Sequence, residues 1–162
     1  MIARRIADHP MQGDYGLVNI SQAKHFTTLA GMKYNHAIIC VGHDEIAEAW
    51  FTGVRTMPMD HYESVVWYRP DMPIQHRYRA AMCARTSHGQ KYDYASWFGL
   101  LFGAGLKLTA WQEFVLKHSV DSGARNCSGF VAECYKQAGT ELVPEKATSL
   151  VLPDDLDFEK AL

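Results

Sequence analysis

The apolar residues of this 162-residue chain change their spacing near Pro73, and this change restricts the fold more than any other feature. Before Pro73 they occur in short runs bounded by turn-forming residues, which is typical of β-strands. After Pro73 they recur three and four positions apart, which is typical of helices that bury one face. A sheet followed by helices predicts an α+β fold.

Four strands are expected in the N-terminal half. The first follows a Gly13-Asp14 turn, and the last ends at Pro70, which cannot continue a sheet. The polar residues Gly42, His43 and Asp44 separate the middle two, which should form a hairpin. The expected strands are 16–20, 37–41, 45–49 and 65–69.

Three helices are expected in the C-terminal half. The first begins behind Pro73 and ends before Gly89. The second, 109–118, opens with a capping-box pattern. The third, 126–138, has the clearest periodicity, with Asn126 as its N-cap and Gly139 as a left-handed C-terminal cap.

The charge and the apolar content exclude several kinds of partner. Sixteen Lys and Arg against eighteen Asp and Glu give a net charge of -2 without any basic cluster, so we expect no nucleic-acid partner. The longest apolar stretch, 97–106, is too short to span a membrane. We expect one domain, 1–162, with a loose acidic tail from about residue 153. The N-terminus lacks the apolar core of a signal peptide, so a cytoplasmic location is the default expectation.

Cys127 is the candidate nucleophile. Capping by Asn126 places its thiol in the first turn of the third helix, where free N–H groups and the helix dipole stabilise a thiolate. The small neighbours Ser128 and Gly129 leave the sulfur open to a substrate, and the Cys127 amide can serve as an oxyanion donor. The alternative is a buried, inert cysteine, which is the role we expect for Cys134 on the same helix face.

A cysteine nucleophile needs a base and a group that orients the base. His36 opens the apolar strand 37–41 and is the best base, with His43 as its main rival. Glu48 lies on the next strand of the hairpin, within reach of His36, and is the expected third member; Asp44 is the next candidate. No His or Cys spacing suggests a metal site, and the chemistry requires no cofactor.

Several segments together resemble a known family. NCSGFVAECYKQAG (126–139) resembles the nucleophile helix of the NlpC-type cysteine peptidases and amidases. The histidine segment NHAIICVG (35–42) precedes it, as do EIAEAWFTGV (45–54) and the YD motif of GQKYD (89–93). This order resembles the circularly permuted papain-like branch, which includes the lecithin:retinol acyltransferase-like proteins. Asn126 replaces the acidic or aromatic residue usual before the cysteine, and 95–117 is a large insertion.

The resemblance implies a papain-like α+β fold in which a small antiparallel sheet carries the base and a helix carries the nucleophile. It implies that Cys127, His36 and Glu48 are catalytic, and that Tyr92 and Ser128 line the substrate cleft. The expected reaction is hydrolysis of a peptide or amide bond through an acyl-thioester. Peptides of the bacterial cell wall (peptidoglycan) are the suggested substrate class, with delivery by a phage particle, a secretion system or lysis.

Two other functions stay open at this point. A lipid acyltransferase, thioesterase or lipid-amide hydrolase would keep the thiolate and use the apolar stretch beginning Trp97-Phe98-Gly99 to hold an acyl chain. A buried core segment explains the same stretch. A non-catalytic binding module on the same fold is the third possibility.

Overall fold

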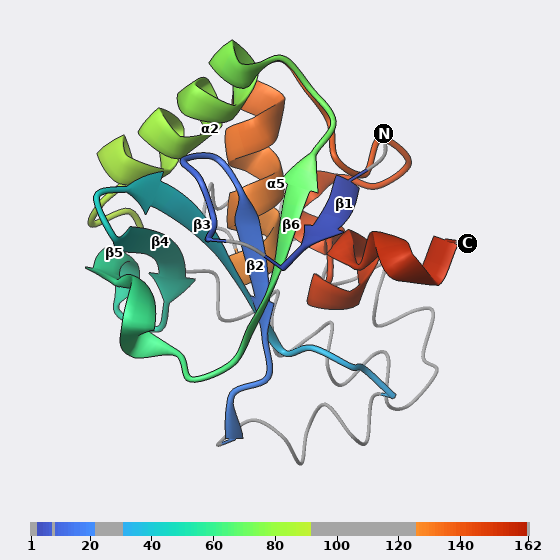
Figure 1. The fold of residues 1–162 in the computed structure, drawn as a ribbon, viewed down its shortest axis with the longest axis horizontal. Helices are drawn as coiled ribbons and strands as arrows, with labels where there is room; N and C mark the ends of the chain where they lie inside the picture. The colour runs from blue at the N-terminus through green and yellow to red at the C-terminus, as the bar shows by residue number, and fades with distance from the viewer. Residues whose placement is uncertain (1–2, 8, 22–30, 92–125, 162) are drawn as a thin grey trace.

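The computed structural model describes residues 3–7, 9–21, 31–91 and 126–161. Their centre is a six-stranded antiparallel sheet with the strand order β1-β6-β2-β3-β4-β5. Two helices, α2 (Ile74–Thr86) and α5 (Cys127–Gln137), pack against each other and against the sheet (Figure 1). The expected α+β class is confirmed.

All four expected strands are present, within one or two residues of their expected ends. They are β2 (Tyr15–Val18), β3 (His36–Gly42), β4 (Glu45–Trp50) and β6 (Val65–Pro70). The hairpin between β3 and β4 is also confirmed, and its turn residues His43 and Asp44 both have positive φ angles.

Two strands were not expected, β1 (Ala3–Ile6) and β5 (Gly53–Pro58). Each is an edge strand that pairs on one side only, β1 with β6 and β5 with β4. An edge strand pairs on one side only, and charged side chains are common on it because they discourage further pairing. β1 carries two exposed arginines, so its sequence contains no run of apolar residues that would predict a strand.

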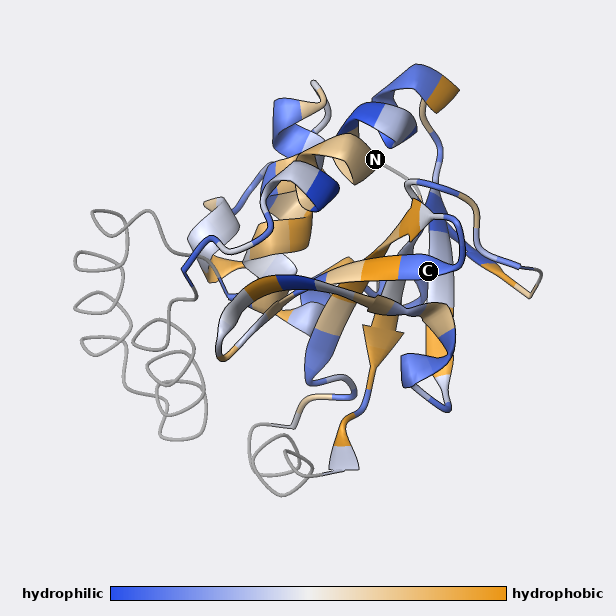
Figure 2. Cartoon of the chain, turned by 90° about the vertical axis from the view of Figure 1, so that its left-hand side faces the viewer, coloured by the Kyte–Doolittle hydropathy of each residue, from blue (hydrophilic) through white to orange (hydrophobic). Residues whose placement is uncertain are grey.

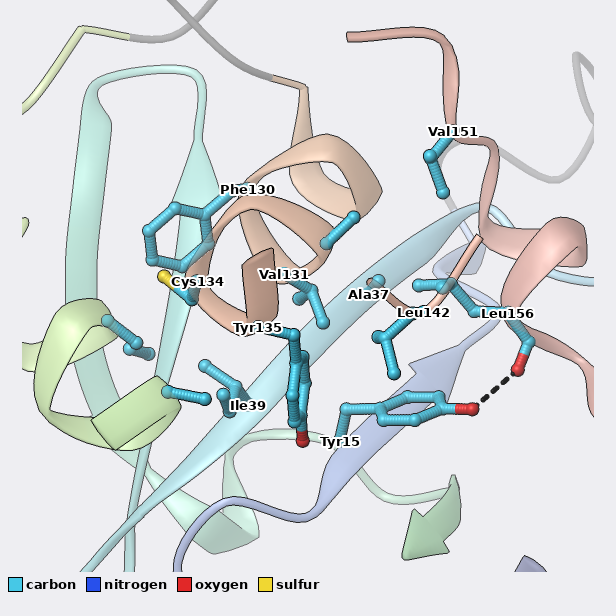
Figure 3. Close-up of a cluster of buried hydrophobic side chains, with 14 of the residues drawn as sticks. Tyr15, Ala37, Ile39, Phe130, Val131, Cys134, Tyr135, Leu142, Val151 and Leu156 are labelled. Atoms are coloured by element: carbon cyan, nitrogen blue, oxygen red, sulfur yellow. Dashed lines mark hydrogen bonds between the residues drawn. The ribbon is translucent and has the colours of Figure 1, made fainter. Parts of the chain in front are cut away.

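The two faces of the sheet bury different clusters. The larger core lies between the sheet and the helices, where Ala37 and Ile39 of β3 meet Val131 and Tyr135 of α5 (Figure 3). A smaller cluster of Val18, Ile38 and Ile46 covers the other face. The apolar colour in Figure 2 accordingly follows the strands through the middle of the molecule.

Both described helices match their expected positions. α2 follows Pro73, and α5 ends ahead of Gly139, whose φ of 90° is the left-handed conformation that its residue type favours. Neither described helix is long and apolar enough to cross a membrane. The expected helix 109–118 lies outside the described residues.

The expected loose tail is wrong, because the segment from Pro153 onward is packed onto the sheet. Leu156 and Asp157 are buried, and the carbonyl of Leu156 accepts a 2.8 Å hydrogen bond from Tyr15 (Figure 3). The Asp154 carboxylate accepts from the backbone N–H groups of Lys33 and Tyr34 at 2.8–3.0 Å. The acidic residues thus satisfy donors in the chain just before β3, so this tail helps to hold the strand that carries His36.

Candidate active site

Cys127 is the first residue of α5 and is 1% exposed. Asn126 caps the helix as expected, since its side-chain oxygen accepts from the Gly129 N–H at 2.5 Å. The amides of the first helical turn have no acceptor within the helix, and they concentrate positive potential there. The thiol of Cys127 therefore lies where the backbone favours its ionised form.

The segment that follows α5 closes tightly over this helix terminus. A Cβ added to Gly129 would lie 2.4 Å from the carbonyl oxygen of Thr148 and 2.7 Å from the Asn126 side chain. The hydroxyl of Ser128 donates to the carbonyl of Val151 at 2.5 Å. Glycine at position 129 is therefore required by close packing. The opening expected beside the sulfur is not seen among the described residues, since Cys127, Ser128 and Gly129 are all buried.

We expect Gly129→Ala to lower the free energy of unfolding by about 1–3 kcal/mol, because the methyl group collides with backbone that cannot move freely. At an unobstructed helical position the same change would stabilise the protein by about 0.5–1 kcal/mol. A urea titration measures whether Gly129→Ala lowers or raises the free energy of unfolding, and so shows whether the clash or the gain in helix propensity is larger. A more stable variant would contradict this account of the contact.

His36 is the first residue of β3, and its ring is held by Glu48 of β4. The His36 Nε2 and Glu48 Oε2 atoms are 2.6 Å apart, and both side chains are almost fully buried. Since a carboxylate can only accept, Nε2 is the donor, which leaves Nδ1 available to the thiol of Cys127. The imidazole and that thiol also form a hydrogen bond with each other. The structure thus brings Cys127, His36 and Glu48 into one contiguous cluster.

Two further side chains hold Glu48 and were not singled out from the sequence. Arg55 of β5 contacts Oε1 through Nε at 2.7 Å and Nη2 at 2.6 Å. The hydroxyl of Tyr62 donates to Oε2 at 2.5 Å. The ring of Trp50 packs edge-on to His36 and face-on to the Arg55 guanidinium. The position of Arg55 depends on the pairing of β4 with β5, a strand that the sequence analysis did not predict.

The electrostatics of the cluster favour an ion pair. Burial opposes charge on His36, but the charges and hydrogen bonds of Cys127 and Glu48 outweigh it and raise the His36 pKa from 6.5 to about 9. Burial likewise opposes ionisation of Glu48, yet the hydrogen bonds and charge of His36, with those of Tyr62 and Arg55, lower the Glu48 pKa to about 2. At neutral pH His36 is therefore cationic and Glu48 anionic.

The pKa of the Cys127 thiol is lowered despite its burial. Burial by itself raises this pKa, but the positive charge of His36 and its hydrogen bond to the sulfur reverse the direction. Hydrogen bonds from the backbone N–H groups of Ala37 and Ser128 act in the same sense. The sulfur is accordingly surrounded by donors from both β3 and α5.

The remaining candidates fall in several places. His43 and Asp44 lie in the exposed turn at the far end of β3 from His36. Ser128 is buried, and its hydroxyl donates a hydrogen bond to the carbonyl of Val151. A contact between Ser128 and a substrate would therefore have to come from the Ser128 backbone. Tyr92 lies outside the described residues. Cys134 is buried in the core, as expected.

Among the residues that the structure describes, no group of three or more His, Cys, Asp or Glu could hold a metal ion. Neither a protein-family model nor a curated protein sequence matches this chain. The geometry of the cluster itself is therefore the basis for inferring a function.

Proposed function

We propose that this protein is a cysteine hydrolase that cleaves an amide or peptide bond through an acyl-thioester. The observation that carries the proposal is the buried Cys127 thiol at a helix N-terminus, hydrogen-bonded to His36, whose other ring nitrogen is held by Glu48. A nucleophile, a base and a group that orients the base form the minimal set for covalent acyl transfer. An inert cysteine needs neither a histidine nor a carboxylate at its sulfur.

The chemistry follows from the protonation states of these three residues. The Cys127 thiolate attacks the carbonyl carbon, and the resulting oxyanion is stabilised by the backbone N–H of Cys127 at the helix terminus. The His36 imidazolium then gives its proton to the leaving amine as the carbon–nitrogen bond breaks. Water, deprotonated by the now neutral His36, attacks the thioester and releases the acid, which restores the thiolate and the imidazolium. Glu48 keeps the imidazole in place throughout.

The resemblance to the permuted papain-like branch supports the same class. In that arrangement a small antiparallel sheet supplies the histidine before a helix supplies the cysteine, and here His36 of β3 precedes Cys127 of α5. We propose the permuted papain-like fold on this basis, and cell-wall peptides as the first substrates to examine. The apolar stretch that suggested a lipid substrate lies within 92–125, outside the described residues.

An acyl-enzyme can be trapped without knowledge of the natural substrate. We expect p-nitrophenyl acetate to add one acetyl group to the wild-type protein, at Cys127, with a burst of p-nitrophenolate equal to the enzyme concentration. Cys127→Ala should lose the burst and the adduct completely. Cys83→Ala is the matched control, because Cys83 is a half-buried free thiol on α2, and it should keep both. Equal acetylation of several cysteines in the wild type would overturn the proposal.

A further inference from the structure

Glu48 belongs to a site that holds two negative charges in the working state. The thiolate of Cys127 and the carboxylate of Glu48 are both almost fully buried, and His36 alone can balance only one of them. Two buried anions beside a single cation leave one charge uncompensated, which is strongly unfavourable in a protein interior. The site therefore needs a second cation, and among the described residues that contact this cluster Arg55 is the remaining one.

We propose, as an extension of the hydrolase function above, that Arg55 is a positioning residue that supplies this second positive charge and so allows Cys127 and Glu48 to be ionised together. Arg55 does not contact the sulfur. It acts through Glu48, which in turn holds His36 against the thiol.

The position of Arg55 suits this role. Arg55 lies directly opposite Glu48 in the pairing of β4 with β5, so the backbone itself sets their separation. Two nitrogens of its guanidinium reach the same carboxylate oxygen, Oε1, and this leaves Oε2 to His36. The ring of Trp50 covers the guanidinium, with Cζ 4.6 Å from the ring centre.

The side chain of Arg55 is only partly buried. It is 28% exposed while Glu48 is fully buried, so the cation stays partly hydrated and the anion does not. A partly hydrated guanidinium costs less to desolvate than a second buried charge. Arg55 thus adds a positive charge to the cluster without a second fully buried side chain.

Tyr62 completes the set of groups that face Glu48. Its hydroxyl donates to Oε2 but carries no charge, because burial and the neighbouring carboxylate raise the Tyr62 pKa far above neutral. The exposed ring of His61 packs on Tyr62 and lies next to it in sequence. The charged groups in the cluster itself are therefore Cys127, His36, Glu48 and Arg55, and their charges sum to zero.

The test is the pH dependence of Cys127 alkylation by iodoacetamide, followed on the Cys127 peptide by mass spectrometry. Arg55→Gln removes the charge, and we expect the low-pH midpoint of alkylation to rise by about one pH unit or more, which slows the reaction about tenfold at pH 6. Arg55→Lys keeps the positive charge but not the planar set of guanidinium donors, and its alkylation midpoint should lie close to that of the wild type. A role confined to packing would not separate these two variants.

A double variant keeps the test decisive if Arg55→Gln alone folds poorly. Arg55→Gln with Glu48→Gln removes one charge of each sign, so the thiolate and His36 again balance, and the midpoint should fall below that of Arg55→Gln. Arg85→Gln is the control, because Arg85 forms an ion pair with Glu45 away from the site, and its profile should match the wild type. Thermal unfolding of each variant confirms that the folded protein is measured.

The outcomes separate this inference from the function that it extends. An ordinary thiol profile for Cys127 in the wild-type protein would overturn the hydrolase proposal itself. A depressed wild-type midpoint that Arg55→Gln leaves unchanged would overturn the role of Arg55 alone. Equal shifts in Arg55→Gln and Arg55→Lys would show that lost geometry, and not lost charge, is responsible.

Discussion

Replacing His36 with alanine should slow the alkylation of Cys127 at pH 6 by about a hundredfold, because the thiol pKa rises and less of the thiol is ionised. Burial raises the pKa of this thiol, and the charge and hydrogen bond of His36 are the main effects that reverse it. Without the imidazole only the backbone N–H groups of Ala37 and Ser128 oppose burial. The Cys127 thiol should then be mostly protonated at every pH below the ordinary pKa of a cysteine.

His43→Ala is the matched control for this variant. His43 lies at the other end of the same strand, in an exposed turn, and its loss should leave the rate at Cys127 unchanged. His36→Gln tests whether the packing of Trp50 against the ring matters, because it fills more of the space without supplying a charge. If Cys127 is alkylated at the wild-type rate in both His36→Ala and His36→Gln, His36 does not activate the thiol.

The parts of the site that the sequence predicted depend on local rules. The N-cap role of Asn126 follows from residue type and from where the periodic pattern starts, so the first-turn position of Cys127 could be derived without knowledge of the fold. The meeting of His36 and Glu48 needed only the hairpin between β3 and β4. The observed register, in which Ile39 pairs with Ala47, places both side chains on the same face of the hairpin.

The contacts that were missed join segments far apart in the chain or depend on an unrecognised strand. Arg55 reaches Glu48 only through the pairing of β4 with β5, and β5 has no clear alternation of apolar and polar residues. Residue type alone predicts a loose tail, because acidic side chains are usually solvated. Asp154 is instead used by backbone donors about 120 residues earlier in the chain. Neither periodicity nor capping carries information about such distant partners.

Glu48→Gln should have the opposite electrostatic effect from Arg55→Gln, because it removes an anion from the same neutral cluster. In the wild-type protein we expect a second rise in Cys127 alkylation near pH 9, where His36 loses its proton and the thiolate is freed from the ion pair. Glu48 supports the protonated form of His36 through its charge and hydrogen bond, so in Glu48→Gln this upper step should move down toward 6.5, the ordinary His value.

The same titrations contribute to the stability of the fold, and their sign follows from the direction of each shift. The raised His36 pKa means that its interactions stabilise the folded state fully below pH 6.5 and are lost as the pH rises through about 9. The lowered Glu48 pKa means that its contribution is present above pH 4.5 and is lost as the pH falls through about 2. In Glu48→Gln the alkaline loss of stability should therefore be smaller and should end at lower pH, together with the upper alkylation step. An upper step that stays near pH 9 in Glu48→Gln would mean that Glu48 does not tune His36, and its role as the orienting group would have to be abandoned.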